Sequence, residues 1–140
     1  MTQTVDISGW KRKHLALKRE LMRVLPEAVD LATDLLYKET AKNLSGPHYA
    51  TGTRGPMTGQ MPIPRMHYLL SQSLRRKRLN KLISAVYSDE REAKYNKYVH
   101  DGTRRTRPRR FLYDAVIARR PAGQNIMRYR IMAAIRRVGQ

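Results

Sequence analysis

The chain has 140 residues, of which 29 are Lys or Arg and 11 are Asp or Glu, and it contains no cysteine. The lack of cysteine excludes disulfides and thiolate zinc sites, and no apolar run approaches the roughly 18 residues that cross a bilayer. A net charge of +18 causes self-repulsion unless an anionic partner offsets it, and nucleic acid is the usual partner. Residues 1–14 lack the apolar core of a secretory signal. We therefore expect one intracellular domain over residues 1–140, with no membrane partner.

Residues 11–44 are predicted to form the N-terminal helical region. Apolar side chains recur with helical spacing from Trp10 to Leu25, and a similar periodicity continues from Glu27 to Leu44. Pro26 would remove an interior hydrogen bond, but proline is tolerated in the first turn of a helix. The sequence therefore predicts either one kinked helix or a second helix that starts at Pro26.

Residues 45–66 are predicted to be an extended loop or arm. The segment holds half of the chain's glycines and four of its seven prolines, which suit turns and extended backbone. A loop of this length is uncommon in a compact domain unless it has a function. Two interpretations stay open, a flexible surface insertion and an arm that docks on a neighbouring subunit. On the second, Arg54 faces a partner or DNA.

The next segment is predicted to contain a short helix at 67–74 and a strand at 82–88, where β-forming residues alternate. The basic run "RRKRLNK" at 75–81 lies between them. Such a run is typical of a solvated edge that discourages aggregation, and direct contact with phosphate is the alternative. The candidate partner-facing or DNA-facing residues of this run are Arg75, Arg76 and Arg78.

A third helix is predicted from residue 90 to residue 99, with Asp89 as its cap. Its helical spacing directs Tyr95, Tyr98 and Val99 toward the core. The dipeptide Asp101-Gly102 favours a tight turn and ends this helix.

The C-terminal part is predicted to be helical again from Arg109, with Phe111, Leu112 and Ala115 facing inward. Pro121-Ala-Gly123 is expected to separate this helix from a last one at 124–138. The predicted fold is therefore α+β, with a long N-terminal helix or kinked helix pair and C-terminal helices packed on a small β-sheet, and with a long extended Gly/Pro-rich loop.

The sequence offers little for catalysis. The histidines at 14, 48, 67 and 100 lack the helical spacing of metal ligands, and no serine lies in a nucleophile elbow. The glycines at 52, 55 and 59 do not have P-loop spacing. We therefore expect no enzyme, no catalytic residue, no metal and no cofactor. Zinc-finger, RNA-recognition and leucine-zipper motifs are missing too, so the charge suits sequence-blind attraction of phosphate better than base readout.

The stretch "AKYNKYVHDGTRRTRPRRFLYDAV", residues 93–116, resembles the signature of the tail-component family of long-tailed bacteriophages, known as tail-completion, minor tail or neck proteins. That signature has a helix that ends in an aromatic-rich turn, then Gly-Thr, a basic spacer, an Arg-Pro-Phe-Leu motif and an Ala-containing helix. This chain has Arg110 where proline is usual, and His100-Asp101 where an acid and an aromatic residue are usual. The residues that carry the match are Tyr98, Gly102, Thr103, Arg109, Phe111, Leu112 and Ala115.

The resemblance implies a structural virion protein that forms a homo-oligomeric ring at the phage head–tail junction, after assembly in the host cytoplasm. Its implied partners are portal-proximal connector or stopper proteins, the tail terminator or tail tube, and packaged DNA that crosses the lumen without sequence-specific contact. Sixfold and twelvefold rings both stay open. In such a ring, the arginines of the turn face a partner or DNA, namely Arg104, Arg105, Arg107 and Arg110. The rival interpretation is a sequence-nonspecific basic nucleic-acid-binding protein of ribosomal or packaging type.

Overall fold

The computed structural model of the chain describes residues 8–46, 69–104 and 108–139. Most of the predicted arm lies outside these ranges, and so do Arg54, Arg105 and Arg107. The elements, in chain order, are the helices and strands α1 (Ser8–Asn43), α2 (Leu69–Gln72), β1 (Leu74–Asn80), β2 (Ile83–Ser88), α3 (Asn96–Asp101) and α4 (Phe111–Gly139). The predicted α+β class, with long terminal helices and a small sheet, is confirmed.

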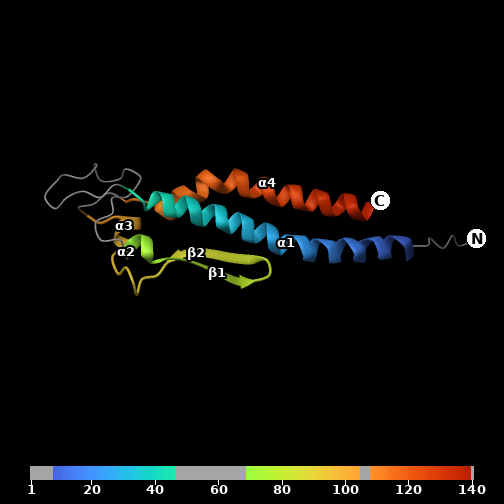
Figure 1. Cartoon of the computed structure of the whole chain (residues 1–140), viewed down its shortest axis with the longest axis horizontal. Helices are drawn as coiled ribbons and strands as arrows, with labels where there is room; N and C mark the ends of the chain where they lie inside the picture. The colour runs from blue at the N-terminus through green and yellow to red at the C-terminus, as the bar shows by residue number, and fades with distance from the viewer. Residues whose placement is uncertain (1–7, 47–68, 105–107, 140) are drawn as a thin grey trace, which may run out of the picture.

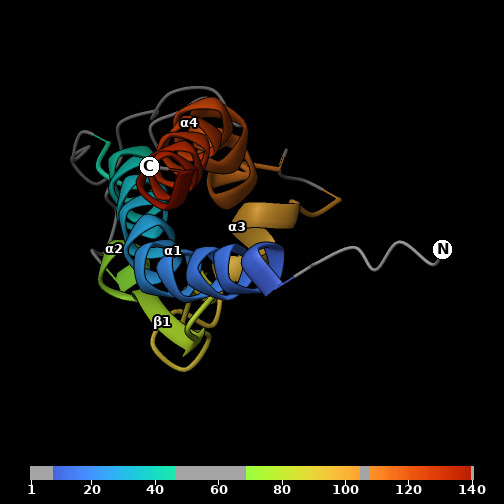
Figure 2. The ribbon, with the colours of Figure 1, turned by 90° about the vertical axis from the view of Figure 1, so that its right-hand side faces the viewer.

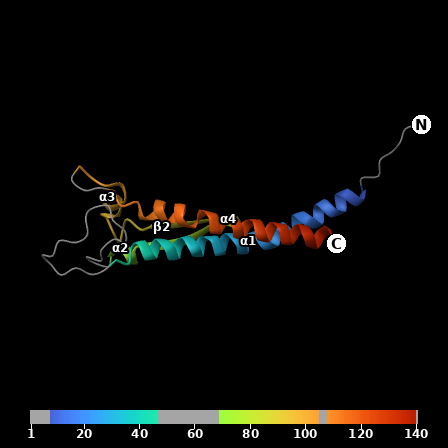
Figure 3. The same ribbon diagram turned by 90° about the horizontal axis from the view of Figure 1, so that it is seen from above.

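Helix α1 is one continuous helix of 36 residues that includes Pro26. The predicted new start at Pro26 is therefore wrong, whereas the alternative of a single helix holds. The ribbon of α1 changes direction once along its length (Figure 3), and an interior proline is an ordinary cause of such a bend. Val24 and Ala28, on either side of Pro26, are buried. We infer that this packing keeps the helix intact across the lost hydrogen bond.

Helix α4 runs antiparallel to α1, so α1 begins and α4 ends at the same end of the molecule (Figure 1). A Cβ added to Gly123 would lie 3.7 Å from the Cβ of Ala32, which places the two helices close together at their middle. The predicted break at Pro121–Gly123 is wrong, because α4 is continuous through both residues. As in α1, packing along the helix outweighs a single proline.

The strands β1 and β2 form an antiparallel hairpin in which Arg75 pairs with Tyr87 and Arg78 pairs with Ser84. The predicted strand at 82–88 is confirmed to within one residue. The basic run, which was not predicted to be a strand, forms most of the partner strand β1, and this strand is a largely exposed edge of the sheet, in agreement with the predicted solvated edge. Asn80 Oδ1 accepts a hydrogen bond of 2.8 Å from Leu82 N–H at the turn. The views along and across the molecule both place α1 between α4 and this hairpin (Figures 1 and 2).

The helix predicted at 90–99 is shorter and later than expected, since α3 covers Asn96–Asp101. The Asp89 carboxylate accepts the N–H of Arg91 at 2.9 Å, and its carbonyl accepts the N–H of Ala93 at 3.0 Å. These bonds make a turn in place of the predicted cap. Because the helix begins later than predicted, its side chains face other directions, and Tyr98 is 61% exposed. The predicted core position of Tyr98 is therefore wrong.

The core lies at the end of the molecule where α1 ends and α4 begins. Its buried residues come from four different segments, and partly buried side chains from α1, β2, α3 and α4 pack around them. The buried members are Leu44, Leu70, Leu74, Ala93 and Phe111. The other end of the α1–α4 hairpin has no such cluster in the described residues.

Candidate functional site

Apart from Tyr98, the residues that carry the family resemblance lie in an elbow, defined here as residues 99–104 and 108–115. Gly102 ends α3 with φ 79° and ψ 178°, a backbone conformation that is essentially restricted to glycine. The N–H of Arg109 donates a hydrogen bond of 2.9 Å to the carbonyl of Val99, so the chain closes on itself across the turn. The predicted turn at Gly102 is confirmed.

Phe111 anchors the elbow in the core, where its side chain is 1% exposed. Its carbonyl accepts a hydrogen bond of 3.0 Å from Asn43 Nδ2, which ties the start of α4 to the end of α1. The ring of His100 meets the Phe111 ring edge-on, with centroids 5.2 Å apart. Ala115 is fully buried and Leu112 packs beside the cluster, while Thr103 is exposed. The predicted core position of Phe111 is therefore confirmed.

Two titratable side chains of the elbow, His100 and Arg109, each have a buried nitrogen atom. His100 Nε2 and Arg109 Nε are buried and have no hydrogen-bond partner in the described residues, and burial lowers the pKa of Arg109. His100 Nδ1 lies 2.8 Å from Asp101 Oδ1, and this hydrogen bond lowers the pKa of Asp101. Sequence adjacency suggests that these two side chains point apart, but the turn brings them together. Arg109 is thus a structural part of the elbow.

The three arginines of β1 that were predicted to face a partner or DNA all form ion pairs within the chain. Arg78 forms an ion pair of 2.7 Å with Asp30 and donates a hydrogen bond of 2.9 Å to the carbonyl of Pro26. Arg76 pairs with Asp34, and Arg75 pairs with Glu92. Arg104 and Arg110 are exposed and have no ion pair within the described ranges.

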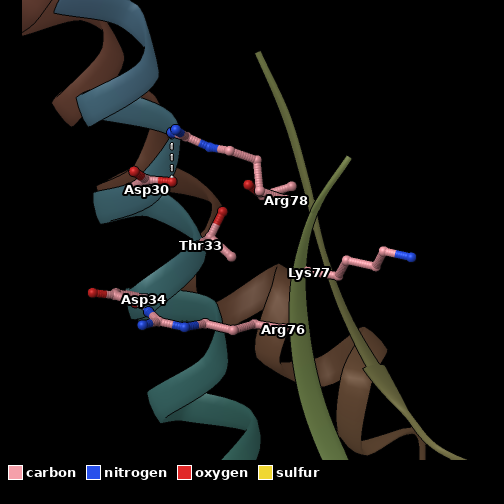
Figure 4. Close-up of a pocket in the computed structure, with 7 residues that line it drawn as sticks. Asp30, Thr33, Asp34, Arg76, Lys77 and Arg78 are labelled. Carbon is pink, nitrogen blue, oxygen red and sulfur yellow. Dashed lines mark ion pairs between the residues drawn. The ribbon is translucent and has the colours of Figure 1, made fainter. Parts of the chain in front are cut away.

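A pocket lies between α1 and the hairpin, and Figure 4 shows its lining. Arg76 and Arg78 extend from β1 to Asp34 and Asp30, which are one helical turn apart on α1, whereas Lys77 points away from α1. Two neighbouring carboxylates are the usual equipment of acid–base chemistry, but each of these is paired with an arginine. The arrangement therefore joins the hairpin to α1, and it leaves no free carboxylate in the pocket.

All the acidic residues of α1 form ion pairs that join α1 to another element. Each of the five pairs with at least one arginine that lies outside α1, on β1 or on α4. On the α4 side, Glu39 contacts Arg119 at 2.5 Å and Glu27 contacts Arg130 at 3.3 Å. The full set is Glu20, Glu27, Asp30, Asp34 and Glu39.

Glu20 is the most strongly held of these acids. Its Oε1 lies 2.6 Å from Arg23 Nη2 and 2.7 Å from Arg137 Nη1. The hydrogen bonds from Arg23 and then from Arg137 lower the pKa of Glu20 to about 2. Glu20 is also the first acid of α1, because residues 8–19 contain none.

Unpaired cations such as Arg104 and Arg110 lie elsewhere in the described residues, but one group of unpaired cations lies where α1 begins and α4 ends. We call this group the basic end, and all its side chains are exposed and without an ion pair in the described residues. Sequence reasoning missed it, because it followed the densest arginine runs; the absence of any acid between Ser8 and Glu20 was the usable signal. The basic end consists of Lys11, Arg12, Lys13, Lys18, Arg19 and Arg136.

Aromatic and apolar side chains accompany these cations. Trp10 is 69% exposed, and its ring centroid lies 5.3 Å from that of His14 at a tilt of 51°. A mostly apolar pocket between the two helices is lined by Trp10, His14 and Leu17 of α1 and by Ile135 and Val138 of α4. This pocket confirms that the two helix ends lie together.

Comparisons with protein-family models, with curated proteins and with solved structures gave no match to this chain. Within the described residues, no group of His, Cys, Asp and Glu side chains could hold a metal ion. In the same residues, no helix has the length and apolar character needed to cross a membrane.

Proposed function

We propose that the chain is a structural subunit of the head–tail junction of a long-tailed phage, where it assembles into a ring that lets DNA pass. One observation carries this proposal: the residues of the resemblance form a single unit, with Gly102 at a glycine-specific turn and Phe111 locked in the core. Sequence similarity over about 25 residues thus coincides with a definite piece of structure.

The β-hairpin supports a role in assembly. Register places Arg75 and Lys77 on the face away from α1, opposite Tyr87 and Ala85 of the other strand, and Ile83 pairs with Asn80 beyond an irregularity that follows Arg78. Leu79, Ile83 and Tyr87 are exposed, and both outer edges of the two-stranded sheet lack a strand partner in the described residues. Exposed apolar faces and open edges are typical of contact surfaces. A closed ring needs two different faces of this kind on each subunit.

The rival function is sequence-nonspecific binding of nucleic acid by an independent basic protein. The unpaired cations of the basic end favour it, because they give a monomer a site for phosphate without any ring. The two functions differ in whether assembly is required.

Gene order and assembly together test the proposal. We expect the coding gene to lie among genes for a portal, a capsid protein and a tail tube. Co-expression with the products of the flanking genes should give closed rings of fixed copy number in negative-stain images and in native mass spectrometry. Ribosomal neighbours, or a chain that stays monomeric with every flanking product, would contradict the proposal.

Surface variants make the ring test specific. Ile83→Ser with Tyr87→Ser changes the outer face of the hairpin, and we expect it to abolish rings while the helical circular dichroism is kept. Tyr129→Ser is the matched control, because Tyr129 is 73% exposed on α4 and belongs to no described cluster. Rings lost equally in both variants would argue against the hairpin as the contact surface.

A further inference from the structure

We propose that the basic end is a sequence-independent binding site for the phosphate backbone of nucleic acid. This inference deepens the proposed function and rests on it for the biological source of the DNA. It assigns the contact to named residues at the opposite end of the molecule from the arginine-rich turn.

The first argument is where the surplus charge is left. Every carboxylate of α1 forms an ion pair with an arginine of β1 or α4. The positive charge of these five arginines is therefore neutralised by a neighbouring negative charge. The stretch from Ser8 to Arg19 has no acid, and Glu20, the next residue, is held by both Arg23 and Arg137. The antiparallel pairing then adds Arg136 of α4 to the same end, because its neighbour Arg137 pairs with Glu20. A cluster of this kind neutralises phosphates and releases their counterions on binding.

The second argument is spacing. The pairs Lys11-Arg12 and Lys18-Arg19 are seven residues apart, which is nearly two helical turns and about 10.5 Å along α1. Both pairs therefore lie on the same side of the helix. Repeated cations along an exposed helix suit a polymer that carries negative charge at short, regular intervals, as a nucleic acid does.

The third argument is the aromatic pair. Trp10 and His14 expose ring surface among the cations, and a base can stack on such a ring. An anionic bilayer fits less well. Trp10 and Leu15 are both exposed, but they lie about 140° apart around α1 at 100° per residue. An interfacial helix needs its apolar residues on one face.

The test follows the fluorescence of Trp10, the only tryptophan of the chain, while a 30-base-pair DNA duplex is added to the full-length protein. We expect a saturable change and a fall in affinity with salt. Four to six phosphate contacts predict a log–log slope between about −4 and −5, at about 0.9 per contact. A wild-type protein without salt-dependent binding would overturn the inference.

Two variants with equal loss of charge localise the site. Arg12→Gln with Arg19→Gln should lower duplex affinity at least about tenfold near 0.1 M salt and reduce the slope by about 1.8. Arg104→Gln with Arg110→Gln removes two exposed arginines at the elbow and should change affinity less than about threefold. Equal losses, or a larger loss at the elbow, would overturn the assignment. Circular dichroism checks that both variants keep the helical content of the wild type.

Two competitors separate the partner classes. Vesicles with 30% phosphatidylserine and poly-glutamate, each at the same concentration of negative charge as the duplex, should bind more weakly than DNA. Tighter binding of either would overturn the choice of nucleic acid. Rings without duplex binding would remove this inference alone, whereas duplex binding by a chain that never assembles would remove the proposed function alone.

Discussion

The two ends of the α1–α4 hairpin use the same residue types for different purposes. At the elbow end, Phe111 is buried and Arg109 is half-buried, with the Arg109 backbone closing the turn on Val99. At the basic end, Trp10 is exposed and Arg12 and Arg19 have no carboxylate partner in the described residues. The difference shows that the number of arginines does not predict their role. What decides it is whether a carboxylate or a buried surface lies within reach.

The largest expected effect tests the anchor of the elbow. Phe111→Ala removes the largest fully buried side chain of the described residues and should lower the free energy of unfolding by about 3–5 kcal/mol. Urea denaturation measures this change. Tyr129→Ala is the control and should cost no more than about 0.5 kcal/mol, because exposed positions contribute little. A loss below about 1 kcal/mol for Phe111→Ala would rule out an anchor.

Replacing a glycine by alanine should change the free energy of unfolding less than Phe111→Ala does. The change should be a loss of stability at the turn and none, or a gain, at the basic end. Gly102→Ala forces a side chain into a backbone region that disfavours it and should cost about 1–3 kcal/mol. Gly9→Ala, in the first turns of α1 at the basic end, meets nothing within 4 Å and should be neutral or stabilising by up to about 1 kcal/mol. Thermal denaturation of both variants gives the two signs directly. A neutral Gly102→Ala would show that the turn is not constrained.

Removing the ion-pair partners of the β1 arginines should turn the contact between β1 and α1 into a second binding surface for DNA. Asp30→Asn with Asp34→Asn removes the partners of Arg78 and Arg76; because both pairs are well exposed, the cost should be about 1 kcal/mol or less for each. The two freed guanidinium groups should tighten duplex binding a few-fold.

The control for this pair is Glu90→Gln with Asp114→Asn, which removes two exposed acids with no ion pair in the described residues. It adds the same net charge without releasing an arginine. If both double variants tighten DNA binding equally in the fluorescence titration, net charge explains the gain and local pairing does not.

The smallest expected effect is the pH dependence of Glu20. Its pKa is lowered in the folded state from 4.5 to about 2, so its contribution to stability is complete above about pH 4.5 and is lost as the pH falls toward 2. The difference in urea midpoint between the wild type and Glu20→Gln should therefore shrink between pH 5 and pH 2.5. A constant difference over this range would contradict the lowered pKa.

Much of the fold was predictable, because local patterns specify it. Glycine at 102 predicts a turn whatever surrounds it, and the single Phe111 at the start of an apolar stripe predicts a core position. The errors came from long-range packing. Pro121 predicts a break in the helix, because the sequence does not show that Gly123 of α4 packs against Ala32 of α1. The basic run at 75–81 predicts a solvated edge, and the sequence does not show that Asp30 and Asp34 supply partners for its arginines. No local pattern contains those contacts.

The candidate site was less predictable than the fold for the same reason. Arginine density pointed to Arg75, Arg76 and Arg78, and their pairing with acids depends on how the hairpin meets α1. The full basic end required knowledge that α1 and α4 are antiparallel, because only then does Arg136 join Arg12 and Arg19. The family resemblance predicted the elbow, but it gave no indication of this second end.

The position of the core at one end of the hairpin sets a gradient of local stability along the molecule. Backbone amides of α1 and α4 near Phe111 can exchange with solvent only through openings that disrupt the core. Amides near Trp10 and Val138 are released by separating one ion pair and a shallow apolar contact. Hydrogen exchange should therefore quicken steadily from the elbow toward the termini. A bound polyanion would slow hydrogen exchange at the basic end. The helical turns that are least protected in the free protein would therefore show the largest change when a partner binds.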